Sequence, residues 1–394
     1  MHLSNIAGKL GGGVSKVVQA LLKHQNLSNL NSDLWFFGSK KIINEVANDT
    51  NVKSRKINAL GKNIFKLPFF LSKIKESNYD IIHQHGIFLP ISLFSILRNK
   101  NTKLVISPHG YLEPEKLKVS KLKKNIVLWL FEKRNLKYAD CLVACSIQEA
   151  EALRDFGLKQ PIAILPNGVN NEFIQTPYIE NSVQTFREKH LLSNNKKILL
   201  FLSRIHPFKG VDVFIKSIYA KREDFRKNDW IFLIAGTNEK NYETVLKKYV
   251  FNKKIDDIVK FIGPLYGDEK IAAYDASSCF VLPSKGENFG IVIIEALSRG
   301  VPVISTKSTP WSDLEKYNCG WWIDRSENSF NKILKNLFLI DKETLSNMGL
   351  NGKKLINEKY IWPKISEESV NIYKWVVNDF EKDFKNGFRL FKDT

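Results

Sequence analysis

The sequence is 394 residues long, 43% of its residues are hydrophobic and 12% are aromatic, and its formal net charge at pH 7 is +19. A chain of this length exceeds one ordinary core and suits two domains, and its composition excludes a disordered polypeptide. No stretch approaches the ~18 consecutive apolar residues of a membrane-spanning helix. The charge favours a polyanionic partner, either nucleic acid, an anionic membrane or a phosphorylated substrate, although lysines that merely cover solvated faces would produce it too.

Apolar stretches of strand length alternate with amphipathic stretches of helix length along most of the chain, which predicts layers of parallel α/β structure. The predicted strands cover residues 1–6, 34–37, 80–83, 104–107, 141–144, 162–165, 198–202, 230–235, 259–262, 279–282 and 303–305. The predicted helices cover residues 14–24, 90–97, 117–137, 147–156, 211–220, 242–251, 268–276, 290–299 and 364–380. Near-continuous apolar strands are typical of parallel sheets that are covered on both faces.

Two doubly wound Rossmann-like domains that face each other across a cleft would account for this order of elements. Ligands in such folds bind at the carboxyl ends of the strands. We predict a first domain at residues 1–172, a polar linker at 173–195 and a second domain at 196–363. A helix and a basic tail are expected at residues 364–394. The first strand is short for a domain of this kind.

Three consecutive glycines separate the first predicted strand from the helix that starts at Val14. Gly12 and Gly13 can let the backbone approach a ligand without interference from a Cβ atom, and they tolerate positive φ angles. A simple tight turn explains the run equally well. The spacing is not GxGxxG, and the Lys-Ser/Thr pair of a Walker A motif is missing, so neither a dinucleotide nor ATP is favoured.

Three other polar residues follow predicted strands closely. His109 comes after residues 104–107, and Arg204 and Lys209 come after residues 198–202. Two cations in a loop between a strand and a helix suit a diphosphate, in particular one that leaves during a reaction. A histidine at the carboxyl end of a strand is placed for an active site, although lone histidines are commonly structural and loop lysines are commonly solvated.

Glu287 and Glu295 carry the most specific pattern of the sequence, two carboxylates separated by seven residues at a strand-to-helix turn. Glu287 lies in the predicted loop, and Glu295 lies about one turn into the predicted helix. Free backbone N–H groups at a helix start bind phosphate, and a carboxylate deeper in the helix can accept hydrogen bonds from sugar hydroxyls. We therefore predict a nucleotide-sugar site that also includes the residues between them, Asn288, Phe289, Gly290 and Ile291.

Together these motifs resemble the GT-B glycosyltransferases, and specifically the retaining enzymes of family 4. The resemblance rests on the order and spacing of five segments, Gly11 to Gly13, His109-Gly110, Pro166 to Val169, Arg204 to Gly210, and Glu287 to Glu295. It extends over residues 1 to about 310. Two positions depart mildly from the family's pattern, because Ser203 stands where glycine is usual and Asn170 stands where aspartate often occurs.

The resemblance implies a role for each charged residue of the second half. Glu295 would bind the ribose hydroxyls of the nucleotide, and Glu287 would lie beside the donor sugar and its reacting centre. Arg204 and Lys209 would hold the diphosphate and stabilise its charge as it leaves. No Asp-x-Asp motif follows a predicted strand, so we expect protein cations to meet this charge without a metal or any other cofactor.

The resemblance also implies contacts from the backbone and from the first half of the chain. His109 would contact the donor sugar or its phosphate. Gly12 and Gly13 would approach the diphosphate or the acceptor closely. The anion site would be completed by the backbone amides of Phe289, Gly290 and Ile291.

The expected reaction is retaining transfer of a sugar from a nucleotide diphosphate sugar to an acceptor hydroxyl. Thr309-Pro310-Trp311 and Gly320-Trp321-Trp322 resemble a subgroup that builds bacterial surface polysaccharides, although core or turn packing would also explain these tryptophans. The expected acceptor is a polyprenyl-linked saccharide, with a soluble acceptor as the alternative. Because the first residues lack the features of a signal peptide, we expect a cytoplasmic protein, peripheral at the inner face of the membrane.

A basic segment at residues 116–137 supports the expectation of membrane binding. Lysines and an arginine flank the apolar stretch Ile126 to Phe131. Basic residues beside an apolar and aromatic stripe can form an interfacial helix on an anionic leaflet. An ordinary helix with one buried face would show the same pattern.

Three other functional classes remain open from the sequence. A catalytically inert nucleotide-sugar-binding subunit would carry the same motifs. A nucleic-acid-binding protein would explain the charge, but the paired carboxylates would repel phosphates, and no zinc, RNP or helix-turn-helix pattern is present. We therefore expect no nucleic-acid partner. An epimerase or phosphorylase of the same fold is a further alternative, although the sequence has no lysine motif typical of pyridoxal phosphate attachment.

Overall fold

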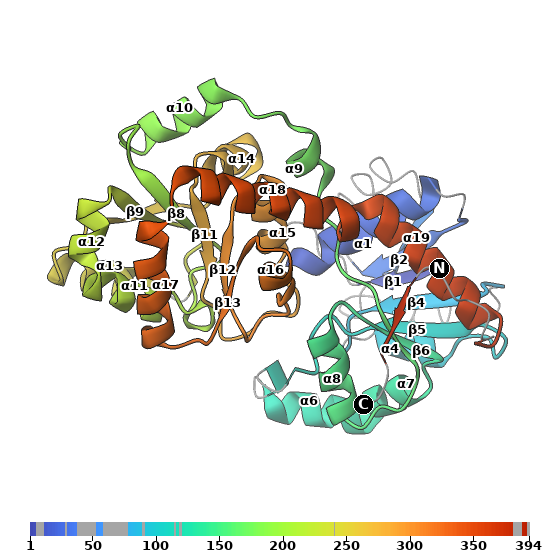
Figure 1. The fold of residues 1–394 in the computed structure, drawn as a ribbon. Helices are drawn as coiled ribbons and strands as arrows, with labels where there is room; N and C mark the ends of the chain where they lie inside the picture. Colours follow the sequence, from blue (N-terminus) through green and yellow to red (C-terminus); the bar gives the residue numbers. More distant parts are fainter. Residues whose placement is uncertain are drawn as a thin grey trace. The chain divides into compact units, whose positions relative to one another are not determined.

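Two parallel β-sheets, each flanked by helices, organise the part of the chain that the computed structural model describes (Figure 1). The described residues are 1–4, 12–27, 30–37, 53–57, 78–88, 91–113, 116–117, 120–239, 241–380 and 388–391. They form two units, one made of Met1–Gly168 together with Trp362–Thr394 and the other made of Val169–Ile361. Gly11, Pro90 and Lys118 belong to predicted features and lie outside the described residues.

The described strands of the first unit form one sheet in the order β14-β7-β6-β5-β4-β1-β2-β3. Their bounds are β1 (His2–Ser4), β2 (Asp33–Phe37), β3 (Lys53–Ile57), β4 (Ile81–His85), β5 (Lys103–Ser107), β6 (Cys141–Ala144), β7 (Ile162–Ile164) and β14 (Arg389–Leu390). All neighbours are parallel except β14, which pairs antiparallel with β7. The order of the strands reverses between β1 and β4, so the carboxyl ends of these two strands flank a topological switch point.

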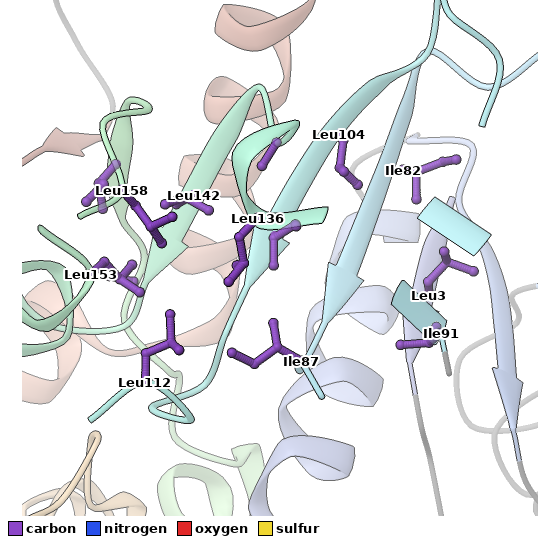
Figure 2. Packing of buried hydrophobic residues seen from close by; sticks show 14 of the residues in the cluster. Leu3, Ile82, Ile87, Ile91, Leu104, Leu112, Leu136, Leu142, Leu153 and Leu158 are labelled. Carbon is purple, nitrogen blue, oxygen red and sulfur yellow. The ribbon is translucent and has the colours of Figure 1, made fainter. Parts of the chain in front are cut away.

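Helices cover both faces of this sheet, and an apolar core lies against its strands. The described helices are α1 (Gly12–Leu27), α4 (Ile91–Ile96), α6 (Lys121–Val127), α7 (Lys133–Lys137), α8 (Ile147–Asp155) and α19 (Trp362–Val377), with a π-helical turn, η3 (Leu128–Glu132), between α6 and α7. Figure 2 shows Leu3 of β1, Ile82 of β4 and Leu104 of β5 in the core with Leu136 of α7 and Leu153 of α8. The C-terminal helix α19 packs on α1, which places both ends of the described chain in this unit.

The sheet of the second unit is entirely parallel, in the order β10-β9-β8-β11-β12-β13. Its strands are β8 (Lys197–Leu202), β9 (Trp230–Ala235), β10 (Val259–Gly263), β11 (Cys279–Leu282), β12 (Val303–Thr306) and β13 (Gly320–Ile323). Every residue of β9 and β11 is buried, as expected of strands covered on both faces. The strand order is that of a Rossmann fold, with its switch point between β8 and β11.

The helices of the second unit cover both faces of its sheet. Their bounds are α9 (Asn171–Gln175), α10 (Glu180–Lys189), α11 (Val211–Ala220), α12 (Arg222–Lys227), α13 (Tyr242–Asn252), α14 (Gly267–Asp275), α15 (Ile291–Ser298), α16 (Asp313–Lys316), α17 (Glu327–Leu339) and α18 (Lys342–Lys359). A short 3-10 turn, η4 (Pro207–Lys209), precedes α11. The prediction of two doubly wound α/β domains is therefore confirmed.

Several elements differ from the predicted ones. The expected linker at 173–195 carries α10 and most of α9, because Phe173, Val183 and Phe186 are buried. The chain divides at 168/169 and again at 361/362. Trp362 packs closely over Gly168, where a Cβ atom would lie 2.6 Å from the indole ring. The strands β3, β13 and β14 were not predicted, and each lies at the edge of its sheet, where the apolar signal is weakest.

Candidate functional site

Two loops meet at the switch point of the second unit. One follows β8 and carries Arg204 and Lys209, and the other follows β11 and carries Glu287. Gly210, at φ 73°, ends the first loop where a Cβ atom would lie 2.0 Å from the carbonyl oxygen of Pro283. Only glycine fits this approach, so Gly210 brings the two loops into contact.

Lys209 and Glu287 form an ion pair across these loops, with contact between Lys209 Nζ and Glu287 Oε1. Both side chains are only 12% exposed. The Ser284 hydroxyl donates a hydrogen bond of 2.7 Å to the same carboxylate oxygen. A cation and an anion that are held together in a shielded position can each bind a group of opposite charge once a ligand separates them.

The loop from Glu287 ends at the start of α15. Gly290 has a φ of 84° and directly precedes the first helical residue, Ile291. The carbonyl of Phe289 accepts a hydrogen bond from the indole N–H of Trp311, which holds this turn in place. The amides of a first helical turn lack intrahelical partners and carry the positive end of the helix dipole, so this turn presents an anion-binding surface.

Glu295 lies in the second turn of α15, where two groups from α14 converge on its Oε2 atom. Lys270 Nζ lies 2.6 Å away, and the Tyr274 hydroxyl donates over 3.0 Å. Burial and the adjacent charge of Glu295 raise the pKa of Tyr274 well above its ordinary value, so the hydroxyl keeps its proton. The carboxylate is therefore held in one orientation.

Arg204 does not join the pair of Lys209 and Glu287. Its guanidinium donates hydrogen bonds of 3.0 and 3.2 Å to the carboxylate of Glu239. The side chain of Arg204 is 62% exposed, and an exposed ion pair contributes little free energy. Arg204 can therefore leave Glu239 and bind another anion at a small cost. Of the four charged residues predicted for this site, the structure pairs Lys209 with Glu287, anchors Glu295 on α14, and leaves Arg204 accessible on the same loop.

His109 lies at the end of β5 in the first unit, in a turn of unusual backbone conformation. His109 and Gly110 have φ angles of 55° and 75°, which is costly for the histidine. The carboxylate of Glu149 holds this turn by accepting a hydrogen bond from the Gly110 amide, and it accepts another, of 2.7 Å, from the Cys145 amide. Ser146 caps the helix that carries Glu149, with a bond of 3.1 Å from the Glu149 amide. One carboxylate therefore fixes the loops after β5 and β6.

The side chain of His109 lines a small cavity in the first unit with His85, Cys145, Asn167 and Trp362. Burial, with a smaller contribution from Lys116, lowers the pKa of His109 to about 4. The imidazole is therefore neutral at physiological pH and can accept a hydrogen bond through one nitrogen.

Gly12 and Gly13 form the first two residues of α1, and Gly11 lies outside the described residues. The helix begins two residues earlier than predicted. The glycines therefore stand at a helix start after β1, at the switch point of the first unit. Their predicted approach to a diphosphate or an acceptor remains a prediction.

Three buried imidazoles, those of His2, His83 and His85, offer nitrogen atoms within 4.8 Å of one another. Burial lowers the pKa of all three well below the ordinary value, and neutral imidazole is the form that binds transition metals. The spacing of the nitrogen atoms and the neutral form of the rings are both compatible with a bound metal ion. However, every ring nitrogen of the three already lies within hydrogen-bond distance of another side chain.

Sequence reasoning missed the residues that position the predicted ones. Lys270 and Tyr274 are one helical turn apart and so share a face, but nothing in the sequence indicates that Glu295 is their partner. Glu149 could have been found, because Ser146 and Glu149 have the spacing of a capping box. Ser284 carries no signal of its own.

Comparison with known proteins bears on the family and on the fold. Residues 11–173 match the family model "Glycosyltransferase Family 4", and residues 182–355 match the model "Glycosyl transferases group 1". The uncharacterized glycosyltransferase MJ1607 of Methanocaldococcus jannaschii is 27% identical over 229 residues, which make up 54% of each chain. The chain thus spans about half the length of this curated relative.

Two solved structures are similar to this chain in fold. WaaG, a glycosyltransferase involved in lipopolysaccharide biosynthesis, superposes with a TM-score of 0.69 and 16% identity, over 94% of this chain and 99% of WaaG. Anabaena Alr3699/HepE in complex with UDP-glucose superposes with a TM-score of 0.73 and 15% identity, over 95% of this chain and 99% of HepE. At these identities the likeness shows the fold alone.

Proposed function

We propose, from the premise that this chain belongs to the GT-B glycosyltransferases, that it transfers a sugar with retention from a nucleotide diphosphate sugar to an acceptor hydroxyl. The observation that carries the proposal is the shielded pair of Lys209 and Glu287 beside the start of α15. The pair and the helix start combine a cation, an anion and free amides within one switch point, and these are the groups that a sugar diphosphate requires.

Binding of the donor would separate the ion pair. The diphosphate would take Lys209 as its counterion, with the amides at Gly290 and Ile291 and the accessible Arg204 completing its contacts. The carboxylate of Glu287 would then be free to accept hydrogen bonds from the hydroxyls of the sugar. Glu295, held by Lys270 and Tyr274, would receive the ribose hydroxyls.

The reaction would break the bond between the anomeric carbon and the diphosphate oxygen and form a bond from the same face to the acceptor oxygen. The proton of the acceptor hydroxyl would pass to the leaving phosphate, and the leaving group would keep the electron pair. The residues of this chain would stabilise the charge that develops on the diphosphate, because fixed cations and amides need no reorganisation as the bond breaks. We propose no metal in this step, since Lys209 and Arg204 can supply the positive charge.

The proposed acceptor is a lipid-linked saccharide of surface-polysaccharide synthesis, and the proposed location is the cytoplasmic face of the membrane. WaaG, a structure of similar fold, takes part in lipopolysaccharide biosynthesis, and HepE binds UDP-glucose. Among the described residues, no helix has both the length and the apolar character needed to cross a bilayer. We propose that contact with lipid occurs at a surface of the first unit.

The segment from α6 through α7 is the surface that we propose for this contact. Its inner face is anchored by Glu132, whose carboxylate accepts hydrogen bonds of 2.8 Å from the Phe88 amide and the Ser92 hydroxyl. Its outer face carries exposed apolar side chains at helical spacing, Leu122, Ile126, Trp129 and Leu130. Exposed basic residues flank them, Lys121, Lys123, Lys133, Arg134 and Lys137. An apolar stripe bordered by cations suits an anionic leaflet.

A thermal-shift screen across UDP-, GDP- and ADP-sugars tests the proposed function. We expect one nucleotide class to raise the melting temperature, since ligand at 100-fold its Kd adds about 2.7 kcal/mol to the free energy of unfolding. Glu295→Ala should abolish the shift, whereas Glu188→Ala, an exposed position on α10, should preserve it. A protein that responds to none of these donors, or that binds one without transferring or hydrolysing its sugar, would contradict the proposal.

A further inference from the structure

A continuous series of side-chain hydrogen bonds connects His109 with the interior of the first unit. His109 Nε2 lies 3.2 Å from His85 Nδ1, and His85 Nε2 lies 2.9 Å from His2 Nδ1. His2 Nε2 lies 2.9 Å from Gln25 Oε1, and Gln25 Nε2 lies 2.8 Å from Ser369 Oγ. The series therefore links the loop after β5 to α19 through the buried side chains of β4, β1 and α1.

The direction of these hydrogen bonds is set at the α19 end. The Ser369 hydroxyl donates to the backbone carbonyl of Ser366 over 2.6 Å, so its oxygen is left to accept from Gln25. The amide of Gln25 must then present Nε2 to Ser369 and Oε1 to His2. Because a carbonyl oxygen only accepts, the hydrogen between them belongs to His2 Nε2.

The same reasoning carries the assignment to His109. A neutral imidazole has one donor nitrogen and one acceptor nitrogen, and burial lowers the pKa of His2 and His85 far enough to keep both neutral. Since His2 donates through Nε2, its Nδ1 accepts from His85 Nε2. The Nδ1 atom of His85 then accepts from His109 Nε2. This leaves the Nδ1 atom of His109 with an unshared electron pair.

A second branch from Gln25 agrees with this direction. Gln25 Nε2 lies 3.3 Å from the hydroxyl of Tyr373, which lies 2.6 Å from His83 Nδ1. His83 Nε2 lies 2.8 Å from the Ser107 hydroxyl, two residues before His109. If Tyr373 accepts from Gln25 and donates to His83, then His83 is also protonated on Nε2. Both branches are satisfied by one orientation of the Gln25 amide.

We propose that this chain of hydrogen bonds, from the Ser366 carbonyl to His109, fixes His109 as the Nε2–H tautomer and presents its Nδ1 as an acceptor for a hydroxyl of the donor sugar. The choice of a sugar hydroxyl rests on the proposed function, whereas the tautomer does not. A nitrogen lone pair accepts from an O–H group but repels a phosphate oxygen, so the Nδ1 atom of His109 would favour the sugar over the diphosphate. Gln25, His2 and His85 act as positioning residues.

Long-range 1H–15N NMR spectra of ligand-free protein labelled with 15N-histidine test the assignment, because they distinguish the two neutral tautomers from the imidazolium. The sequence holds seven histidines, and signals are assigned with His109→Gln and His85→Gln. We expect His109, His85 and His2 to be neutral and protonated on Nε2 at pH 7.5. A His109 protonated on Nδ1, or on both nitrogens, would overturn the proposal.

Gln25→Met removes the amide that sets the direction, and we expect His109 to populate both tautomers in this variant. Gln19→Met makes the same change on the same helix, at a residue that is not part of the hydrogen-bond chain, and should keep the wild-type spectrum. An unchanged single tautomer in Gln25→Met would refute the role of the hydrogen-bond chain.

Added Zn²⁺ should leave the spectrum unchanged, and conversion of His2, His83 and His85 to metal-bound signals would show a metal site instead. These spectra are recorded without a nucleotide sugar, so they test the tautomer of His109 independently of the proposed function.

Discussion

Lys270 Nζ lies 2.6 Å from Glu295 Oε2, and this contact joins α14 to the helix whose start forms the anion-binding turn. Both side chains are largely buried. The pair therefore has a structural consequence that is separate from any ligand, because a buried charge that loses its partner is strongly destabilising.

Lys270→Met should lower the free energy of unfolding by about 3 kcal/mol, since Glu295 would remain as an unpaired buried charge. Urea denaturation measures this change. Lys354→Met breaks an i,i+4 pair with Glu358 in which both side chains are exposed, and it serves as the matched control, with an expected loss of at most about 0.5 kcal/mol. Equal losses of free energy of unfolding in the two variants would show that the contact with Glu295 stabilises the protein no more than an exposed ion pair does.

Lys209→Met should reduce the kcat of sugar transfer by roughly 10²–10³-fold, because the leaving diphosphate would lose its most shielded cation. The single variant also leaves Glu287 uncompensated, so stability must be measured beside activity. The double variant Lys209→Met/Glu287→Gln should recover stability without recovering activity. Activity restored in the double variant would mean that Lys209 serves the fold and not the reaction.

His109→Ala should weaken binding of the nucleotide sugar by about tenfold, the value of one hydrogen bond of about 1.4 kcal/mol, and should leave binding of the nucleoside diphosphate unchanged. Lys209→Met should weaken both ligands. Calorimetric titration of the two variants with both ligands separates these effects. If His109→Ala weakened both ligands equally, His109 would contact the phosphate.

Trp129→Ser should reduce binding to vesicles that contain anionic lipid, because Trp129 is 83% exposed in the middle of the apolar stripe. Flotation with vesicles of neutral and of anionic lipid measures the binding, which should also weaken as salt rises. Phe251→Ser, at an aromatic residue of the second unit that is 74% exposed, is the matched control and should bind as the wild type does. Equal binding to neutral vesicles at high salt would count against the proposed surface.

The buried histidines should make the protein less stable as the pH falls below their ordinary pKa of 6.5. The pKa values of His2, His83 and His85 are lower in the folded than in the unfolded protein. At a pH between the folded and the unfolded pKa, the unfolded state binds more protons, so the folded state becomes less stable as the pH falls. The stability that these neutral histidines contribute is fully present above pH 6.5 and is lost as the pH falls towards their pKa values in the folded protein. His109 behaves in the same way, with a folded pKa of about 4. The slope is at most about 1.4 kcal/mol per pH unit for each histidine.

Urea unfolding of the wild type and of His83→Gln between pH 5 and 7 tests this linkage. The buried carboxyls of Glu132 and Glu149 have raised pKa values and oppose the trend at low pH, so the difference between the two proteins is the quantity to compare. His83→Gln should lose less stability on acidification than the wild type. Identical pH dependence would mean that His83 titrates normally in the folded protein.

The amino-acid sequence was sufficient to predict the alternation of strands and helices, the two doubly wound domains, the loops that carry Lys209 and Glu287, and the helix that carries Glu295. These features follow from local periodicity, glycine chemistry and the rule that ligands bind beyond the carboxyl ends of parallel strands. They depend on residues that are close together in the chain, and so they can be found without the fold.

Only the tertiary structure decided which side chains are partners. Lys270 and Tyr274 reach Glu295 from α14, and Arg204 pairs with Glu239, a residue that no motif of the sequence indicated. The hydrogen-bond chain to His109 depends on the order of strands in the first sheet, which places His2 beside His85 although 83 residues separate them in the chain. Such pairing is set by how distant elements pack, and no local pattern of the sequence encodes it.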